Sequence, residues 1–392
     1  MARNLDPESI PLNWKYDLLD KLAERCSGHT PSKSFPEYWD GGIKWISLSD
    51  SKRLDKGYVY ETEKEISEEG IKNSSAVLHP AETVVMSRDA GIGKSGVMAS
   101  PMAVSQHFIA WRCDNKQKLH SWFLYNWLQM HQKEFERQAV GSTIKTIGLP
   151  YFKKLKIAVP PFPEQKKIAQ ILATWDKAIT TTEQLLVTSQ QQKKALMQQL
   201  LTGKKRLLDE NGVRFDGEWK YLTFGEAFKV ANKKTSQVKS SDFLDAGSTP
   251  IVDQSQKLIA GYCNVEDAYS DIPVIVFGDH TRCIKWVDFV FCPGADGTQV
   301  LKTRDHIDGK FGYYLLCNTD IPNLGYSRHM RELKEKEFKI PLNPKEQQKI
   351  VLVLSAADRE INALQQKLTH LNQEKKALMQ QLLTGKRRVQ VN

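Results

Sequence analysis

The sequence lacks the segments that would direct a chain into or across a membrane. No stretch approaches the roughly 18 consecutive apolar residues that a membrane-spanning helix requires. The first residues, MARNLDPESIPLNW, are polar and contain no apolar core of the kind found in secretory signals. We therefore expect a cytoplasmic protein.

The six cysteines are too scattered to indicate a metal site or a disulfide framework. No two of them have CxxC spacing, and no group of cysteine and histidine residues has the spacing of zinc ligands. We predict reduced thiols, no metal and no cofactor. The cysteines are Cys26, Cys113, Cys263, Cys283, Cys292 and Cys317.

Sequence signatures of catalysis are missing as well. Neither the GxSxG turn of hydrolases nor the HExxH helix of metalloproteases occurs. Asn343-Pro344-Lys345 lacks the aromatic dipeptide of the NPPY motif of amino-methyltransferases, and no glycine-rich methyl-donor loop precedes it. We predict that the chain is not an enzyme.

The segment SRDAGIGKSGV comes closest to a nucleotide-binding loop. The Walker pattern requires a glycine five positions before Gly93, and that position holds Arg88, so the segment does not match an ATP site. Gly91, Gly93 and Lys94 still form a short cationic loop that could approach a phosphate backbone closely. The alternative is a surface hairpin without a ligand.

Positive charge is present in excess. The chain of 392 residues carries a formal net charge of +10 and has a pI of about 9.1. Such a surplus favours polyanionic partners, so nucleic acid and anionic membrane surfaces are both admissible. Charge alone does not choose between them, because many basic proteins bind neither.

The most informative feature is an internal repeat. KKALMQQLLTGKKR begins at Lys193 and KKALMQQLLTGKRR begins at Lys375, an offset of 182 residues. The same offset aligns PEQKKI, which starts at Pro163, with KEQQKI, which starts at Lys345. The alignment needs no gap between positions 164 and 206, so we interpret each copy as one rigid element.

Both copies repeat apolar residues with the period of a coiled coil. Alternating steps of four and three residues from Ile168 and from Ile350 give two seams of about five heptads. Prolines precede both copies, and Gly203 and Gly385 follow them as candidate C-caps, which predicts two helices of about 57 Å each. Lys375 interrupts the second seam. The first seam is interrupted by Thr182, Ser189 and Lys193.

Two regions outside the repeat, residues 1–160 and 207–343, have the mixed pattern of small α/β domains. Each contains apolar runs that predict strands and then a helical stretch. Each also begins with a tryptophan in similar context, NWKYDLLDKLA at Trp14 and EWKYLTFGEAF at Trp219. We predict an α+β fold in which two mixed α/β domains are separated by two long α-helices, which form an antiparallel coiled coil with a pseudo-two-fold internal repeat. The predicted strands are GIKWISL, AETVVMS, HFIAWRC, DIPVIVFGD, CIKWVDFVFC and TQVLKT, and the predicted helices are SWFLYNWLQMHQKEF and KFGYYLLCN.

This arrangement resembles the specificity subunit of type I restriction-modification systems over the whole chain. The resemblance is carried by the segment PFPEQKKIAQIL, from Pro161 to Leu172, and by KKALMQQLLTGKKR. It implies target-recognition domains at 1–160 and 207–343 and conserved helical spacers at 161–206 and 344–392. It further implies that each domain reads one half of an asymmetric bipartite DNA target, and that the helices set the gap. Catalysis would reside in partners: two methyltransferase subunits and, through them, two restriction subunits.

Candidate DNA-binding residues are polar and basic side chains on loops between the predicted strands. Arginine, lysine, glutamine and aspartate side chains suit base edges, and serine and threonine suit phosphates. GYSRHMRE precedes the second long helix as GSTIKTI precedes the first, which favours both loops. In the first domain the candidates are Ser87, Arg88, Lys94, Ser142, Thr143 and Lys145. In the second they are Lys233, Lys234, Asp253, Gln254, Asp279, His280, Arg282, Gln299, Tyr326, Ser327 and Arg328.

Two other classes of protein remain as alternatives. One is a DNA-modifying enzyme, against which the missing methyl-donor and nuclease motifs argue. The other is a stand-alone coiled-coil adaptor or DNA-binding protein with no restriction-modification partner. DNA affinity that falls steeply with salt would argue against an adaptor, because each neutralised phosphate releases counterions.

Overall fold

The computed structural model describes residues 10–113, 117–141, 145–325 and 327–391. The chain separates into two compact units. Unit 1 comprises Met1–Thr182 and Lys367–Asn392, and unit 2 comprises Glu183–Gln366. Each unit therefore contains one globular domain and part of each long helix.

The two long helices confirm the interpretation of the repeat. Helices α5 (Phe162–Leu200) and α9 (Pro344–Leu382) have 39 residues each. Helix α9 begins at Pro344, and Pro163 is the second residue of α5; the missing amide hydrogen of a proline costs nothing in a first turn. After the last turn, Gly203 and Gly385 have positive φ angles of +71° and +70°, as C-cap glycines do. Within the described ranges, no helix is both long and apolar enough to cross a membrane.

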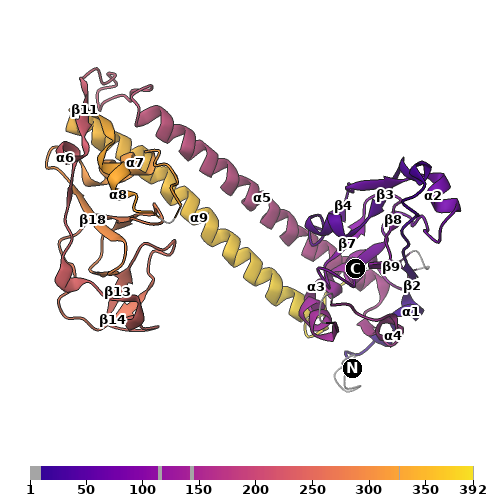
Figure 1. Cartoon of the computed structure of the whole chain (residues 1–392). Helices are drawn as coiled ribbons and strands as arrows, with labels where there is room; N and C mark the ends of the chain where they lie inside the picture. Colours follow the sequence, from indigo (N-terminus) through magenta and orange to yellow (C-terminus); the bar gives the residue numbers. More distant parts are fainter. Residues whose placement is uncertain (1–9, 114–116, 142–144, 326, 392) are drawn as a thin grey trace. The chain divides into compact units, whose positions relative to one another are not determined.

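The predicted seams are the buried faces of these helices. Every seam position is buried or half-buried, whereas most positions between them are exposed. In each unit the beginning of one helix packs against the end of the other, so the antiparallel pairing is confirmed within each unit (Figure 1). The residues that share a core are Ile168, Leu172, Met379 and Leu382 in unit 1, and Met197, Leu200, Ile350 and Leu354 in unit 2.

The lysines that interrupt the seams form ion pairs between the helices. Lys375 Nζ lies 2.5 Å from Asp176 Oδ1 in unit 1. Lys193 Nζ lies 2.5 Å from Asp358 Oδ1 in unit 2. Both the two lysines and the two aspartates are related by the repeat offset of 182 residues. Because a charged residue at one seam position tolerates few partners, the pairs favour this register in each unit.

The other polar seam residues are hydrogen-bonded too. Thr182 Oγ1 donates to the Ala178 carbonyl of its own helix at 2.8 Å. Ser189 Oγ lies in unit 2, where it donates to Glu360 Oε1 at 3.1 Å. The interruptions of the first seam therefore leave these buried hydroxyls satisfied.

The globular domain of unit 1 is built from three sheets. Its elements are β1 (Lys15–Leu18), α1 (Leu19–Leu22), β2 (Glu24–Ser27), β3 (Trp39–Ile46), β4 (Tyr58–Val59), β5 (Lys64–Ile66), α2 (Glu68–Lys72), β6 (Val84–Ser87), β7 (Ser95–Met98), β8 (Ala103–Val104), β9 (Phe108–Arg112), α3 (Ser121–Gln138), α4 (Leu149–Lys153) and β10 (Lys156–Val159). The central sheet has the order β2-β9-β6-β7-β4. A second sheet has the order β5-β3-β8, and β1 pairs with β10. The three predicted strands and the predicted helix of this region are confirmed in β3, β6, β9 and α3.

The globular domain of unit 2 also has three sheets. Its elements are β11 (Trp219–Thr223), α6 (Phe224–Ala227), β12 (Phe228–Val230), β13 (Thr249–Val252), β14 (Gly261–Cys263), β15 (Val274–Gly278), β16 (Ile284–Val287), β17 (Cys292–Pro293), β18 (Thr298–Thr303), α7 (Gly309–Cys317), α8 (Met330–Lys334) and β19 (Glu337–Pro341). The sheets have the orders β12-β18-β15-β16, β14-β13-β17 and β11-β19. The predicted strand CIKWVDFVFC differs from the structure, because it divides into β16 and β17.

The two globular domains share one plan. The order β12-β18-β15-β16 of unit 2 matches β2-β9-β6-β7 of unit 1. The sheet β14-β13-β17 matches β5-β3-β8, including one parallel pair in each. The pair β11-β19 matches β1-β10, so in both domains the first strand pairs with the strand that leads into a long helix. The internal repeat therefore extends through the domains, although their sequences diverge.

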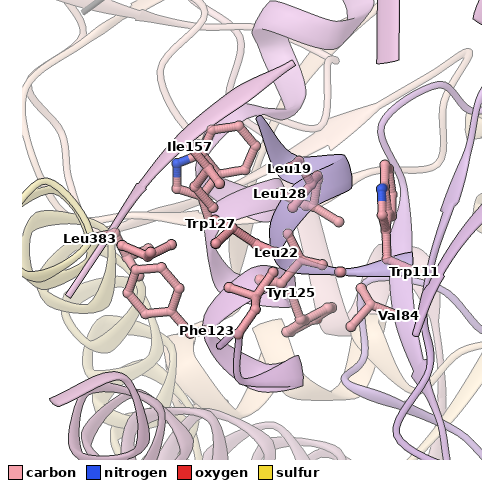
Figure 2. Packing of buried hydrophobic residues seen from close by; sticks show 14 of the residues in the cluster. Leu19, Leu22, Val84, Trp111, Phe123, Tyr125, Trp127, Leu128, Ile157 and Leu383 are labelled. Carbon is pink, nitrogen blue, oxygen red and sulfur yellow. The ribbon is translucent and has the colours of Figure 1, made fainter. Parts of the chain in front are cut away.

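The core of unit 1 joins residues from both ends of the chain. Phe123 and Trp127 of α3 and Trp111 of β9 are buried in one cluster with Leu383, which follows α9. Figure 2 shows Leu383 beside Phe123. Because large aromatic side chains dominate the burial energy of a core, this contact anchors the end of α9 in the domain.

Candidate nucleic-acid interface

In both units a central strand ends at a buried aspartate. The segments VVMSRD, residues 84–89, and VIVFGD, residues 274–279, contain the equivalent strands β6 and β15. Asp89 is 8% exposed and Asp279 is 2% exposed. Buried carboxylates need hydrogen-bond donors, and in each unit donors come from the segment that precedes a long helix.

Asp89 joins three segments of unit 1. Its Oδ1 accepts a hydrogen bond from Thr146 Oγ1, and its Oδ2 lies 2.5 Å from His107 Nδ1. The carbonyl of Arg88 accepts from the Ile147 amide at 2.9 Å. Burial acts to raise the pKa of Asp89, but the hydrogen bonds from Thr146 and His107 outweigh it and hold the pKa below its ordinary value. The turn after β6 is therefore fixed to the segment ahead of α4 and α5.

Asp279 fixes the turn after β15 to the segment ahead of α8 in unit 2, with other donors. Its Oδ1 accepts from the Met330 amide at 2.7 Å, and its backbone carbonyl accepts from the His329 amide at 2.8 Å. His329 is fully buried, and its Nδ1 lies 2.8 Å from that carbonyl. The described ends of the two segments that the sequence matched by position, residues 145–147 and 327–332, therefore hold equivalent turns.

The turn after β6 is a glycine-containing loop beside α3. Gly91 and Gly93 have φ angles of +75° and +81°, which favour glycine. A Cβ atom on Gly93 would lie 2.9 Å from Gln132 Cγ, so a side chain would clash there. A cavity of about 480 Å³ lies at this loop, and Lys94 and Lys145 contribute to its wall. Lys94 of this loop and Lys145 of the segment ahead of α4 thus place two ammonium groups beside one hollow of the surface.

The structure gathers three of the six candidates of unit 1 at this loop. Arg88 is half-buried next to Asp89, and Lys94 and Lys145 line the same cavity. Ser87 is fully buried, and its hydroxyl donates to the Ala90 carbonyl at 3.0 Å, so it holds the turn and is not on the surface. The remaining candidates, Ser142 and Thr143, lie outside the described residues.

In unit 2, three loops meet at the end of β15. Gln254, after β13, accepts from the His280 amide at Oε1 (3.2 Å) and from Thr281 Oγ1 at its carbonyl (2.5 Å). His280 Nδ1 lies 3.2 Å from the carbonyl of Ser327, which precedes α8. Gly297, between β17 and β18, accepts from the Asp279 amide at 2.7 Å. We call the surface formed by residues 253–257, 279–283 and 327–328 the unit 2 platform.

Most candidates of unit 2 lie on this platform, and the structure separates the others from it. The platform carries Asp253, Gln254, Asp279, His280, Arg282, Ser327 and Arg328. Arg282 has a φ of +59°, and its Nη1 donates to the Ile321 carbonyl at 2.8 Å. Arg328 is exposed, whereas Asp279 is buried and holds the turn.

Of the remaining candidates of unit 2, the three that the structure describes are not on the platform. Lys233 pairs with Asp267, and Lys234 is exposed. Gln299 is opposite Phe277 in the β15–β18 pair, and its Oε1 accepts from Asn232 Nδ2 at 2.7 Å. Tyr326 lies outside the described residues.

Sequence reasoning missed a pair of buried glutamates that hold the ends of the long helices. Arg388 donates through Nε and Nη2 to Glu164, with both distances 2.7 Å, in unit 1. Arg206 donates to Glu346 in the same bidentate way, at 2.5 and 2.7 Å, in unit 2. Planar pairs of this kind are the strongest hydrogen-bonded ion pairs in proteins. A basic tail after each long helix is thus held at the first turn of the other.

The glutamines that follow these glutamates hold the globular domains. Gln165 Oε1 accepts from the His120 amide at 2.8 Å, and its Nε2 donates to the Pro160 carbonyl at 2.9 Å. Gln347 accepts from the Asp308 amide at 2.7 Å and donates to Pro341 at 2.9 Å. His120 and Asp308 precede α3 and α7, so each Glu-Gln pair joins a helix frame to a domain. The sequence signal that could have indicated this role is that the Glu-Gln pair recurs at the repeat offset of 182 residues.

The described loops present groups that suit hydrogen bonding to a partner. Among the described residues, no three His, Cys, Asp or Glu side chains are grouped as metal ligands would be. The guanidinium, ammonium, imidazole and amide groups at the two loop surfaces suit hydrogen bonds to phosphates and base edges. The fold and these surfaces together define a protein with two related but different binding domains.

The comparisons with known proteins find relatives of one kind. Residues 11–188 match the model of the type I restriction modification DNA specificity domain. The chain is also similar to curated type I specificity subunits. It is 28% identical to the MjaIX specificity subunit of Methanocaldococcus jannaschii, over 45% of this chain and 41% of that protein. It is 26% identical to a second subunit of that organism, assigned to MjaX, over 70% of each chain. Nearly half of the chain thus matches the type I DNA specificity domain, and the chain is similar to specificity subunits of type I restriction-modification systems.

The fold is also found in the solved structure of a type I S subunit. The S subunit of a type I system from M. genitalium matches with a TM-score of 0.61 and 16% identity, over 97% of this chain and 99% of that chain. At this identity the likeness concerns the fold. The match to the MjaIX subunit spans less than half of that relative's length.

Proposed function

We propose that the chain is the sequence-specific DNA-binding subunit of a type I restriction-modification complex. Each globular domain reads one half of an asymmetric bipartite target, and the paired helices set the spacer. The subunit is non-catalytic and acts in the cytoplasm, and adenine methylation and cleavage are carried out by its partners. The observation that carries this proposal is that one plan of sheets and long helices is built twice, with different side chains on the loop surfaces.

The DNA-facing residues of the proposal are the exposed or half-buried members of each loop surface. In unit 2 they are Gln254, His280, Arg282, Ser327 and Arg328, with Asp253, Lys233, Lys234 and Gln299 at the margin. Unit 1 contributes Arg88, Lys94 and Lys145. Ser87 and Asp279 act by holding turns. Arginine and glutamine form bidentate contacts with guanine and adenine, and the lysines neutralise phosphates.

Two methyltransferase copies dock, in this proposal, on the outer faces of the helices. In unit 1 a groove of about 670 Å³ runs between Tyr58, Tyr60 and Trp122 and the α5 residues Gln170 and Lys177. In unit 2, Leu352 is related to Gln170 by the repeat offset and is 61% exposed. Aromatic side chains such as those of the unit 1 groove are enriched at protein interfaces, whereas a single exposed leucine is common on any surface. Restriction subunits then join through the methyltransferases.

The test is to map modified adenines in cells that carry the intact system. The wild-type chain is expected to give one bipartite motif with a fixed spacer, detected by long-read sequencing. Arg328→Ala should relax one half of this motif and Lys145→Ala should weaken the other. Lys367→Ala, an exposed change on α9, is the charge-matched control and should leave the motif intact. Methylation that shows no bipartite motif, or that persists without this chain, would reject the proposal in favour of a stand-alone adaptor or DNA-binding protein.

A further inference from the structure

A lysine that the sequence reasoning passed over is buried beneath the unit 2 platform. Lys285 lies on β16, and its side chain is 5% exposed. Its Nζ donates to the Asp253 carbonyl at 2.7 Å and to the Lys257 carbonyl at 2.5 Å, and lies 3.6 Å from Asp253 Oδ1. All of these acceptors belong to the loop after β13, so the ammonium group clamps the two ends of residues 253–257.

Burial of this ammonium group makes its contacts hard to replace. Burial lowers the pKa of Lys285 below its ordinary value, and the neighbouring Asp253 acts in the opposite direction. A buried charge is tolerated when hydrogen bonds satisfy it, and here two backbone carbonyls and one carboxylate do so. An apolar side chain of similar length would leave both carbonyls of the loop without this donor.

The loop that Lys285 clamps is packed tightly against the rest of the platform. A Cβ atom on Gly294 would lie 2.8 Å from Asp253 Cβ. One on Gly297 would lie 2.5 Å from Gln254 Oε1 and 2.7 Å from His280 Cδ2. With so little free space, a shift of residues 253–257 must also move Gln254 and His280, two of the residues proposed to face DNA.

Unit 1 has a different polar clamp at the equivalent position. In the β6–β7 pair Ser95 is opposite Met86, as Lys285 is opposite Val276 in the β15–β16 pair. Ser95 is fully buried, and its amide donates to Asp55 Oδ1 at 3.0 Å in the loop between β3 and β4. Both domains thus use this strand position to hold the loop that follows the equivalent strand, β3 or β13, through the backbone of Ser95 in unit 1 and through the side chain of Lys285 in unit 2.

We propose that Lys285 is a positioning residue for the half-site read by unit 2. By clamping residues 253–257, it sets where Gln254 and His280 meet the base edges, without touching DNA itself. This inference rests on the proposed function. It predicts that loss of the ammonium group changes which bases are accepted in one half-site, while the general affinity for DNA is retained, because that affinity comes from exposed phosphate contacts.

The experiment compares Lys285→Met with wild type in the assembled complex with its methyltransferase partner. Binding is measured at one salt concentration to the target and to DNAs with single base-pair changes in either half-site. Lys229→Met, an exposed change on β12, is the matched control. We expect Lys285→Met to lose about tenfold in discrimination at the half-site that Arg328→Ala alters, with the other half-site unchanged.

The outcomes separate the inference from the function on which it rests. Equal discrimination by Lys285→Met and wild type at both half-sites overturns the positioning role. A loss of affinity that is the same for all DNAs also overturns it, and indicates a structural role alone. A wild-type complex that discriminates at neither half-site rejects the proposed function and this inference with it. If the methionine variant does not assemble, Lys285→Arg keeps the charge but alters the clamp geometry. A smaller loss of discrimination at the same half-site then supports the positioning role. Discrimination equal to that of wild type overturns the positioning role.

Discussion

The two units agree in the contacts that hold the chain together and differ in the loops that meet solvent. Gln165 and Gln347 make the same hydrogen bonds to equivalent backbone groups. Asp89 and Asp279 also keep one position, yet the first is bound by side chains and the second by a backbone amide. A bidentate or seam contact permits few residue types, whereas a turn can be held by any suitably placed donor. The frame can therefore stay constant while the loop surfaces change.

The frame contacts are nevertheless not energetically equal. The side chain of Arg206 is 19% exposed, and its guanidinium lies 5.6 Å from the centre of a Trp219 ring. Arg388, its counterpart in unit 1, is 41% exposed. Because a charge that is left unpaired costs more where water is excluded, the same substitution should affect the units differently.

The largest expected effect comes from removing the buried glutamates. Glu346→Gln should destabilise unit 2 by about 3 kcal/mol, since it leaves Arg206 without its partner carboxylate. Glu164→Gln should destabilise unit 1 by only about 1 kcal/mol, because water reaches Arg388. Native-state hydrogen exchange of amides in each unit measures the two losses separately. Glu183→Gln, an exposed change on α5, is the control, and equal losses in the two units would contradict the comparison.

A second difference between the units is a response to acid in unit 1. His79 is fully buried, and burial, followed by the charge of Arg112, lowers its pKa to about 4 from 6.5. The unfolded chain binds this proton near pH 6.5 and the folded chain only near pH 4. Unit 1 should therefore lose stability as the pH falls through this window, by about 2 kcal/mol at pH 5, and should show no such effect above it.

The variant His79→Gln tests this origin of the acid response. It should flatten the decrease in unit 1 stability between pH 7 and pH 5, measured by hydrogen exchange corrected for intrinsic rates. His306→Gln, an exposed change in unit 2, should leave that decrease in place. An unchanged pH dependence in the His79 variant would assign the acid response to other groups.

The smallest expected effect concerns the ion pairs of the seams. Lys375→Glu should destabilise unit 1 by about 1 kcal/mol, because it places two carboxylates together in a half-exposed position. The double change Lys375→Glu and Asp176→Lys should recover most of this loss, as a double-mutant cycle would record. The pair of Lys193 and Asp358 in unit 2 serves as the unaltered reference. If swapping the two charges does not recover the stability of unit 1, packing and not charge sets the register of the helices.

The long helices were predictable because their signals are local and repeated. The 3.5-residue period, the leading prolines and the glycine caps lie within each copy, so the sequence alone predicts element, length and ends. The partners of Lys193 and Lys375 were not predictable, because they lie on the other helix, more than 160 positions away. Only antiparallel pairing in a definite register brings these charges together.

The loop surfaces were predicted less well, because residue type does not reveal burial. Ser87 and Asp279 are polar and follow strands, as many surface residues do, yet both are buried and hold turns. Lys285 stood in an apolar strand and was passed over, although the burial of Val287 on the same face is consistent with an inward position. Whether such a polar side chain is buried depends on which loop covers the end of the sheet.

The sequence by itself determined that a globular region and a long helix occur twice, because periodicity and repetition are properties of neighbouring residues. It also determined the ends of the helices and the mixed α/β character of the domains. Only the tertiary structure decided that each Glu-Gln pair binds a domain and a basic tail, and that Lys285 clamps a loop. These contacts join residues distant in the chain, so their geometry exists only after the helices and sheets have packed.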